Sequence, residues 1–412
     1  MKPLIVSRSD LAGGAARAAT RLALALREAG IGAEMLSAEK RSDYPWVIGR
    51  RSFKRDAKAI ARSAVGTTLL RLQKPQDVNL RSINLLASRL DRTINSLPHD
   101  IVNLHWIGSE MLSIEAVGRI TKPVVWTLHD MWGFAGAEHY TPDNVDARWR
   151  HGYPPSVGGG LDLDRATWKR KYRAWRRPQH VICPSNWLAE CVRASQLMAT
   201  WPVHAIANPL DLAVFQPWPK ALAREMLRLP ANTPLLGFGA MGGTRDPRKG
   251  WDLLSAALQD VAKAGIGVEA VIFGQSRPTV AIDVPMPTHW VGHLSDDVAL
   301  ALLYSAVDAV VVPSRQDNLP QTATEPQACG CPVVAFDTGG LRDAVAHGET
   351  GLLAAPFDTG VLARHLIALL GDADLRTRQG EAARARAERL WDTATLVARY
   401  EAVYDSAWRS TV

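Results

Sequence analysis

The sequence predicts an α/β protein built from two doubly wound domains, each a parallel sheet covered by helices. Near-continuous runs of Val, Ile and Leu, each as long as a strand, alternate with longer helical patterns. Such runs are typical of strands that are buried on both faces. The strand–helix series also occurs twice along the 412 residues, a length that suggests two or three domains.

The predicted strands follow one another with helical segments between them. In the first half they lie at 3–7, 33–37, 101–106, 124–128, 180–184 and 203–206. In the second half they lie at 235–241, 268–274, 290–294, 309–313, 332–336 and 351–354. Helical patterns include 15–29, 251–264 and 322–329. The strand–helix–strand order predicts right-handed crossovers and therefore parallel sheets.

A proline-containing segment at 208–211 marks the join between the two series. We therefore expect an N-terminal domain of residues 1–208, completed by an amphipathic C-terminal helix within 393–412, and a second domain of residues 209–392. Open α/β sheets bind ligands at the carboxyl ends of their strands. Two such sheets that face each other across a cleft would offer a small-molecule site.

The composition is that of an ordinary globular protein, with 47% hydrophobic and 22% charged residues. It excludes disorder, collagen, coiled coil and small disulfide scaffolds. The longest apolar stretch, 298–312, is interrupted by Asp308 and is shorter than a membrane span of roughly 18 residues. The first residues lack the apolar core of a signal peptide. We therefore expect a cytoplasmic protein whose four cysteines are small buried residues.

The formal net charge of +7 is unevenly distributed. Residues 1–208 carry 30 Lys+Arg and 18 Asp+Glu, whereas residues 209–412 carry 18 Lys+Arg and 23 Asp+Glu. The cations concentrate in 50–92 and in 165–177, where tryptophans interleave with them. A basic half indicates an anionic partner, which could be nucleic acid, a phospholipid surface or a phosphorylated substrate. Aromatic rings among cations suit sugar stacking or a membrane interface, and solvated basic helices are the alternative.

The most informative stretch is 313–334. A buried strand ends at its start, a polar loop that carries Asp317 follows, and a helix begins near Gln321 with Glu325 about a turn inside it. Backbone N–H groups at a helix N-terminus favour anions, and both carboxylates could face one ligand. The alternative makes Asp317 a turn or cap residue and Glu325 a solvated helix residue.

A second stretch, 237–254, places a glycine-rich basic loop between a predicted strand and a predicted helix. Its glycines let the backbone approach a ligand closely. Its cations, Arg245, Arg248 and Lys249, could neutralise a diphosphate. An ordinary basic surface loop is the alternative.

Together these stretches resemble the D/E-x7-E region of the retaining glycosyltransferases of the GT-B fold, in glycosyltransferase family 4. The resemblance rests on Asp317 and Glu325 and on the Gly-x-Pro-Val-Val and Gly-Gly motifs at 330–334 and 339–340. It implies the GT-B fold, in which two Rossmann-like domains face each other across a cleft and the C-terminal helix returns to the first domain.

The resemblance also implies how a nucleotide-sugar donor would be bound. Glu325 would hold the ribose hydroxyls, whereas Asp317, with the backbone of Asn318, Leu319 and Pro320, would hold the donor sugar and the distal phosphate. Lys249 matches the family's lysine at the donor diphosphate. The family's helping arginine is replaced by Gly243, so Arg245 is the first candidate for the second cation and Arg248 the next. The glycines that the resemblance places against the donor are Gly13, Gly14, Gly243, Gly274 and Gly292.

His129 ends a predicted strand, where the active sites of parallel sheets gather. The family often has a histidine there that contacts the donor sugar, which implies a catalytic role for His129 beside Asp317, Lys249 and Arg245. The segment 128–140 resembles a bacterial subgroup that acts in extracellular polysaccharide assembly. The family's first domain receives the acceptor, and the acceptor-side candidates are Arg17, His105, Trp106, Trp132, Glu138 and His139. For His105, a structural role is the alternative.

These matches predict a retaining transfer of a hexose from a UDP- or GDP-sugar to a glycan or a lipid-diphosphate-linked acceptor. The segments 50–92 and 165–177 would then contact the anionic inner face of a membrane. No Asp-x-Asp pair ends a predicted strand, so we expect no required metal and no other cofactor. An epimerase or phosphorylase of the same fold, and a non-catalytic nucleotide-sugar-binding partner, are the alternatives. No nucleic-acid-binding motif appears, so we expect no nucleic-acid partner.

Overall fold

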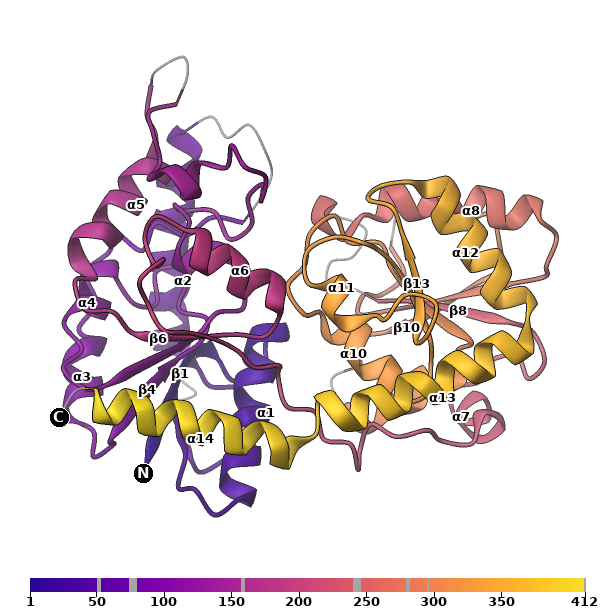
Figure 1. The fold of residues 1–412 in the computed structure, drawn as a ribbon, viewed down its shortest axis with the longest axis horizontal. Coiled ribbons are helices and arrows are strands. Elements are labelled where there is room, and N and C mark those ends of the chain that lie inside the picture. Colours follow the sequence, from indigo (N-terminus) through magenta and orange to yellow (C-terminus); the bar gives the residue numbers. More distant parts are fainter. Residues whose placement is uncertain are drawn as a thin grey trace. The chain divides into compact units, whose positions relative to one another are not determined.

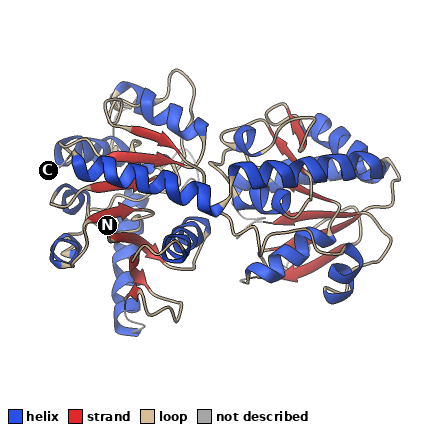
Figure 2. Ribbon diagram, turned by 60° about the horizontal axis from the view of Figure 1, so that its bottom comes forward, coloured by secondary structure: helices blue, strands red, loops and turns tan. Residues whose placement is uncertain are grey.

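The structure, a computed structural model, describes residues 1–49, 53–73, 80–156, 160–239, 246–278, 282–294 and 296–410, with the backbone alone for 53–59. The chain divides into two compact units, which Figure 1 shows. Unit 1 comprises Met1–Pro209 and Ala394–Val412, and unit 2 comprises Leu210–Thr393. Each unit is built on a parallel sheet with helices around it (Figure 2), so the predicted α/β class with two Rossmann-like domains is confirmed.

Within the described residues, the sheet of unit 1 has seven strands in the order β3-β2-β1-β4-β5-β6-β7. Leu4 and Val6 of β1 belong to one core cluster and Ile5 belongs to another, so both faces of this sheet are buried. This explains why the strand sequences are apolar without alternation. The two-residue β3 is too short for an apolar run and was not predicted. The strands are β1 (Pro3–Ser9), β2 (Glu34–Glu39), β3 (Val47–Ile48), β4 (Ile101–Leu104), β5 (Val124–Thr127), β6 (His180–Cys183) and β7 (Val203–Ala205).

The C-terminal helix α14 (Thr393–Arg409) completes unit 1, as Figure 1 shows in yellow. Its residues Leu396, Tyr400 and Tyr404 pack in the same core cluster as Ile5, and Asn103 Nδ2 donates a hydrogen bond of 2.7 Å to Tyr404 Oη. The other helices of unit 1 are α1 (Gly14–Glu28), α2 (Phe53–Leu72), α3 (Leu90–Ser96), α4 (Ile114–Gly118), α5 (Leu163–Ala174) and α6 (Asn186–Ala194), with short 3-10 turns at Met131–Gly133 and Arg148–His151.

In the part of unit 2 that the structure describes, the sheet has six strands in the order β10-β9-β8-β11-β12-β13. They are β8 (Leu235–Gly239), β9 (Glu269–Phe273), β10 (Thr288–Gly292), β11 (Ala309–Val312), β12 (Val333–Phe336) and β13 (Gly351–Ala354). The helices are α7 (Lys220–Met226), α8 (Trp251–Lys263), α9 (Asp297–Ala306), α10 (Gln321–Ala328), α11 (Leu341–Ala344), α12 (Thr359–Gly371) and α13 (Ala373–Leu390), with a 3-10 turn at Pro247–Lys249. Aspartates cap several helices; Asp358 and Asp372 accept hydrogen bonds from backbone N–H groups in the first turns of α12 and α13.

The strand order reverses at one point in each sheet. In unit 1 the reversal lies between β1 and β4, and in unit 2 it lies between β8 and β11. At such a point the two connections leave toward opposite faces, and ligands of open α/β sheets bind beside it at the carboxyl ends of the strands. The loops that follow β1, β4, β8 and β11 are therefore where a site is expected.

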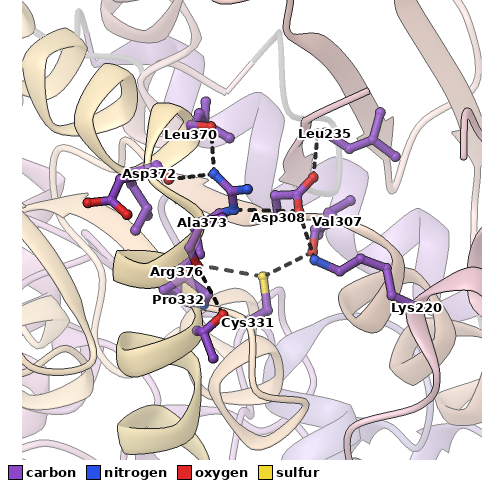
Figure 3. Close-up of polar contacts among 12 residues, drawn as sticks. Lys220, Leu235, Val307, Asp308, Cys331, Pro332, Leu370, Asp372, Ala373 and Arg376 are labelled. Atoms are coloured by element: carbon purple, nitrogen blue, oxygen red, sulfur yellow. Dashed lines mark hydrogen bonds and ion pairs between the residues drawn. The ribbon is translucent and has the colours of Figure 1, made fainter. Parts of the chain in front are cut away.

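At the opposite end of β11, the buried carboxylate of Asp308 joins several segments of unit 2. It accepts hydrogen bonds of 2.7 Å from Lys220 Nζ, from an Nη of Arg224 and from the Leu235 backbone N–H, and Arg376 Nε lies 3.7 Å away. Figure 3 shows Asp308 between Lys220 and Arg376. Burial would raise the pKa of Asp308, but the charges of Lys220 and Arg224 lower it, so this carboxylate is ionised at neutral pH.

We expect Asp308→Ala to destabilise unit 2 by about 3–5 kcal/mol, because Arg224 would be left buried without its carboxylate. Amide hydrogen exchange of β8 and β11 measures the stability of this unit by itself. Asp260→Ala is the control, since it breaks the exposed pair with Lys263 and should cost at most about 1 kcal/mol. Equal losses in the two variants would contradict the role given to Asp308.

Candidate active site

The loops that follow β8 and β11 are tied together at the carboxyl edge of unit 2. The backbone N–H of Arg315 donates to the carbonyl of Arg248 at 2.8 Å. The Arg315 guanidinium donates to the Pro247 carbonyl at 2.7 Å and to both carboxylate oxygens of Asp252, at 2.8 and 2.6 Å. These contacts bring the two stretches that the sequence singled out into one place.

Asp317 is the centre of this edge. Its carboxylate is only 6% exposed and accepts a hydrogen bond of 2.6 Å from Lys249 Nζ, while Arg248 Nη1 lies 3.3 Å from the same oxygen. The Ser314 hydroxyl and the Asn318 backbone N–H donate to it as well. Burial would raise the pKa of Asp317, but the charges of Lys249 and Arg248 outweigh it and lower the pKa to about 2. The carboxylate is therefore ionised and holds both cations in place.

Two glycines allow the backbone to close around this cluster. Gly250 has φ +70°, and a Cβ there would lie 2.0 Å from the Pro313 carbonyl oxygen. Gly339 has φ +53°, and a Cβ there would lie 2.4 Å from the carbonyl oxygen of Asp317. Only glycine fits both positions without moving the backbone. The Lys249-Gly250 and Gly339-Gly340 pairs thus serve to bring Lys249 and Asp317 together.

Glu325 is buried inside α10 rather than solvated. It is 2% exposed, and its Oε2 accepts a hydrogen bond of 2.9 Å from the Tyr304 hydroxyl. Asn318, Leu319 and Pro320 are also buried, directly before the first turn of α10. The structure therefore rules out the alternative of a solvated Glu325, and it gives Asp317 more than the role of a turn residue.

Two of the remaining donor-side candidates end neighbouring strands. Gly274 follows β9 and Gly292 ends β10, with φ +82° and +78°, and the Gly274 N–H donates to the Gly292 carbonyl at 2.8 Å. A Cβ added to Gly292 would meet no atom within 4 Å, so its backbone faces open space. Arg245 and Gly243 lie outside the residues that the structure describes.

In unit 1, the first helix begins next to the reversal point of the sheet. Gly13 caps α1 with φ +93°, and the Arg17 N–H donates to its carbonyl at 3.0 Å. A Cβ added to Gly13 or Gly14 would meet no atom within 4 Å. A side chain at either position would thus have room, and the side chain of Arg17 is half-buried beside the start of α1.

His105 and His129 form a pair at the same edge, after β4 and β5. His105 Nδ1 lies 2.8 Å from His129 Nε2, and His105 Nε2 is buried without a hydrogen-bond partner among the described residues. Burial lowers the pKa of His129 to about 4 and the pKa of His105 well below its ordinary value. Both rings are therefore neutral at physiological pH.

A buried network lies behind this pair. His139 Nδ1 is 2.6 Å from Asp130 Oδ2 and its Nε2 is 2.7 Å from the Ser82 hydroxyl, while Trp106 Nε1 donates to the same Asp130 oxygen at 3.0 Å. His139 is 2% exposed and Trp106 is half-buried. The network fixes the position of Asp130, which follows His129 in the chain. Because His139 is buried inside this network, its burial argues against the predicted contact with an acceptor.

Trp132 and Glu138, which were predicted on the acceptor side, are also interior. Trp132 is 3% exposed, and the Lys171 ammonium lies over its ring, 3.8 Å from the centroid. Glu138 is 6% exposed and accepts a hydrogen bond of 3.0 Å from the Tyr153 hydroxyl. Burial, reinforced by the charge of Asp164, raises the pKa of Glu138 to about 7. These side chains support the segment 130–139 from inside.

Comparisons with known proteins identify the family. The family model "Glycosyl transferases group 1" matches residues 240–386, and the model "Glycosyltransferase Family 4" matches residues 12–214. A D-inositol 3-phosphate glycosyltransferase of Jonesia denitrificans is 30% identical over 325 residues, which cover 74% of this chain and 72% of the relative. This chain belongs to the group 1 and family 4 glycosyltransferases.

Other comparisons with this chain are partial or show the fold alone. A D-inositol 3-phosphate glycosyltransferase of Xylanimonas cellulosilytica is 34% identical over 210 residues, and the chain spans about half of that relative, 49% of its length. The crystal structure of HepE from Anabaena in complex with UDP-glucose has a TM-score of 0.67 and 19% identity, covering 98% of this chain and 100% of HepE. HepE binds UDP-glucose in that structure, and the likeness between the two chains shows the fold alone.

The basic segment 165–177 is partly interior, contrary to the sequence expectation. Trp168 and Trp175 are 7% and 5% exposed, so their rings do not supply an interfacial surface. Lys171 is fully buried, and its ammonium donates to the carbonyls of Trp132, Ala135 and Gly136. The cations that remain exposed there are Arg173, Arg176 and Arg177.

Several residues of the edge of unit 2 were not predicted. Arg315 and Asp252 lie in the two motif stretches, and their opposite charges after neighbouring strands were a signal that could have found the pair. Tyr304, the partner of Glu325, carried no such signal, because it belongs to an apolar helix of another segment. Among the described residues, no group of three His, Cys, Asp or Glu side chains is arranged to hold a metal ion. None of the described helices is long and apolar enough to cross a bilayer.

We expect the His129 ring to stay neutral down to about pH 4 in the folded protein, because burial lowers its pKa. The unfolded chain takes up this proton at about pH 6.5. The stability contributed by neutral His129 is therefore present above about pH 6.5 and is lost as the pH falls toward 4. NMR of 15N-labelled histidine measures the midpoint directly.

The variant Asp130→Asn provides a second test. Burial lowers the pKa of His129 and the charge of Asp130 partly offsets this, so removing that charge should lower the pKa further. The variant should move the midpoint further down. A midpoint above 6 in the wild type, or an upward shift in the variant, would contradict this account.

Proposed function

We propose that the protein is a retaining glycosyltransferase that moves a hexose from a nucleoside diphosphate sugar to a hydroxyl group of an acceptor. The observation that carries the proposal is the cluster of Lys249, Arg248 and Asp317 at the reversal point of the unit 2 sheet. Membership of the group 1 and family 4 glycosyltransferases supports it. UDP-glucose, named for HepE, makes a UDP-sugar the first donor to test and a GDP-sugar the next.

In this proposal the donor lies on unit 2. Lys249 neutralises the diphosphate, and Arg245 and Arg248 are the candidates for a second cation. Glu325 binds the ribose hydroxyls, and the backbones of Gly274 and Gly292 face the base. Glu325 is buried against Tyr304, so donor binding would require local movement of α10.

The barrier to glycosyl transfer lies in charge separation, because a cationic sugar leaves a diphosphate that gains negative charge. Fixed cations and N–H dipoles stabilise that charge most strongly where water is excluded. Lys249 and the backbone N–H groups at the start of α10 would supply them. We assign Asp317 to positioning, because a carboxylate with a pKa of about 2, held by Lys249, is a weak base and a weak nucleophile. The bond between the sugar and the nucleoside diphosphate would break, and the acceptor oxygen would bond to the sugar on the face from which the diphosphate leaves. The leaving phosphate would take the acceptor's proton, and His129 would contact the donor sugar.

Two kinds of acceptor are compatible with this chemistry. The likeness of segment 128–140 to polysaccharide-assembling enzymes favours a glycan or a lipid-diphosphate-linked oligosaccharide. The names of the relatives from Jonesia and Xylanimonas favour an inositol phosphate. For the lipid-linked acceptor we propose a cytoplasmic protein at the inner membrane face, with Arg173, Arg176 and Arg177 and the described cations of 50–92 as the contacts.

An epimerase, a phosphorylase or a non-catalytic partner would behave differently. An epimerase converts the donor without an acceptor, a phosphorylase releases sugar phosphate, and a non-catalytic partner binds the donor and transfers nothing. Product analysis with and without acceptor separates all of these from a transferase.

We expect Lys249→Met to lower kcat/KM for transfer about 100-fold, the loss typical of one preorganised charge-stabilising donor. Lys263→Met, which removes an exposed lysine of α8, is the control and should leave the rate unchanged. Because Lys249 also pairs with Asp317, the double variant Lys249→Met with Asp317→Asn removes both charges together. If the double variant regained full activity, Lys249 would serve only to neutralise Asp317, and its role at the diphosphate would be wrong.

We also propose that transfer needs no divalent metal, and we expect the rate to survive exhaustive treatment with EDTA. The cationic groups of Lys249 and its neighbours would take the place that a metal holds at a diphosphate. Initial rates before chelation, after it, and after adding back Mg²⁺ or Mn²⁺ test this point. A rate that vanished with EDTA and returned with metal would contradict it.

A further inference from the structure

A groove on unit 1 has no part in the proposed donor site. It has a volume of about 370 Å³ and lies between the end of β1 and one face of α2. Arg8 lines one side, and Ile60, Ser63, Thr67, Thr68 and Arg71 line the other. Their spacing of three and four residues places these α2 side chains on one face of the helix.

The groove offers groups that bind anions and hydroxyls. Arg8 is oriented by Glu39, whose Oε1 accepts hydrogen bonds of 2.9 Å from Nε and 2.7 Å from Nη2, and its guanidinium carbon lies 5.9 Å from the centre of the Trp106 ring. A guanidinium has five N–H donors, so this anchoring leaves donors on Nη1 for a ligand. Fixed arginines bind phosphate by paired hydrogen bonds.

The hydroxyl groups of α2 add a second kind of contact. The Thr67 hydroxyl donates to the Ser63 carbonyl at 2.9 Å and so remains an acceptor. Serine and threonine hydroxyls donate and accept, which suits the hydroxyl groups of a polyol ring. The groove therefore combines cations for a phosphate with hydroxyls for a sugar or cyclitol.

The groove also lies at the carboxyl edge of the unit 1 sheet, where a ligand is expected. The Arg8 backbone N–H donates to the Trp106 carbonyl at 2.8 Å, which joins the end of β1 to the segment that follows β4. That is the carboxyl edge where the sheet order reverses and where Gly13 and the His105–His129 pair lie. A ligand in the groove would thus be bound at the ligand-binding edge of unit 1.

We propose that this groove binds the phosphate group of the acceptor, so that the acceptor is a phosphate-bearing polyol or sugar, with Arg8 and Arg71 on the phosphate and Ser63 and Thr68 on the adjacent hydroxyls. The inference rests on the proposed function and names the substrate class of its acceptor side. Both acceptors considered above carry phosphate. Ile60, 65% exposed at one end of the groove, would lie against the lipid if the phosphate is lipid-linked.

Calorimetry with D-inositol 3-phosphate and with unphosphorylated inositol, in the presence and absence of UDP, tests the proposal. The wild type should bind the phosphate ester at least about tenfold more tightly than inositol, as a charge-assisted hydrogen bond implies. Arg71→Gln should abolish that preference, Arg71→Lys should restore part of it, and Thr68→Val should weaken binding of both compounds. Arg364→Gln, an equal loss of charge on an exposed residue of α12 outside the groove, is the matched control and should change nothing.

A second arm identifies the source of the phosphate. Phosphatidylcholine vesicles with and without a phosphoinositide are compared for sedimentation of the wild type and of Arg71→Gln. Phosphoinositide-dependent binding that Arg71→Gln loses, without binding of the soluble ester, assigns the groove to a lipid-linked acceptor. Binding of the soluble ester alone assigns it to a free one.

Three results overturn the inference: no preference of the wild type for the phosphorylated probe in either the soluble or the vesicle assay, equal phosphate preference in Arg71→Gln and wild type, or an equal loss in Arg364→Gln. UDP binding and the melting temperature, measured in parallel, show that each variant is folded. Transfer to an unphosphorylated acceptor with an unchanged KM would leave the proposed function standing and the groove assignment wrong. Phosphate binding at the groove without any hexose transfer would contradict the proposed function alone.

Discussion

The buried carboxylate of Asp317 is the constraint on which the edge of unit 2 depends. A carboxylate removed from water costs several kcal/mol unless charges and hydrogen bonds compensate it. Here the compensation comes from Lys249, Arg248, the Ser314 hydroxyl and the Asn318 N–H, so groups from two separate loops must converge on one oxygen pair. The close approaches at Gly250 and Gly339 follow from the same requirement, because a side chain at either position would hold the loops apart. The cations that face a diphosphate in the proposed reaction are thus ordered before any ligand arrives.

Local sequence was enough to predict the parts of this edge but not their contact. Asp317, Glu325 and Lys249 stand in patterns of a strand, a loop and a helix, and those patterns are readable along the chain. The ion pair between Lys249 and Asp317 spans 68 residues, and it exists because β8 and β11 are neighbours, which only the sheet order reveals. The bond between Tyr304 and Glu325 depends on the packing of α9 against α10, for which no local pattern exists.

Unit 1 shows why counts of charged and aromatic residues gave a wrong prediction for the segment 165–177. Trp168, Lys171 and Trp175 recur at helical spacing, so they lie on one face of α5 and its C-terminal end, and that face is the buried one. The interval of three and then four residues was available in the sequence, but the high density of cations suggested an exposed surface that meets an anionic partner. Lys171 could be buried because three backbone carbonyls of the segment after β5 receive its ammonium. One cation of this basic segment, Lys171, therefore supports the interior rather than the surface.

The histidine pair of unit 1 is neutral, whereas the edge of unit 2 carries cations. Because burial lowers the pKa of both rings, His105 and His129 contribute hydrogen-bonding groups without charge. A buried N–H without an acceptor is rarer than an unpaired acceptor, so the proton of His105 belongs on Nδ1, the atom that faces His129, rather than on the unpartnered Nε2. His129 then accepts at Nε2 and keeps its own proton on Nδ1. In the proposed reaction the sugar becomes cationic as the diphosphate leaves. A neutral imidazole does not oppose this, whereas an imidazolium would repel the positive charge on the sugar.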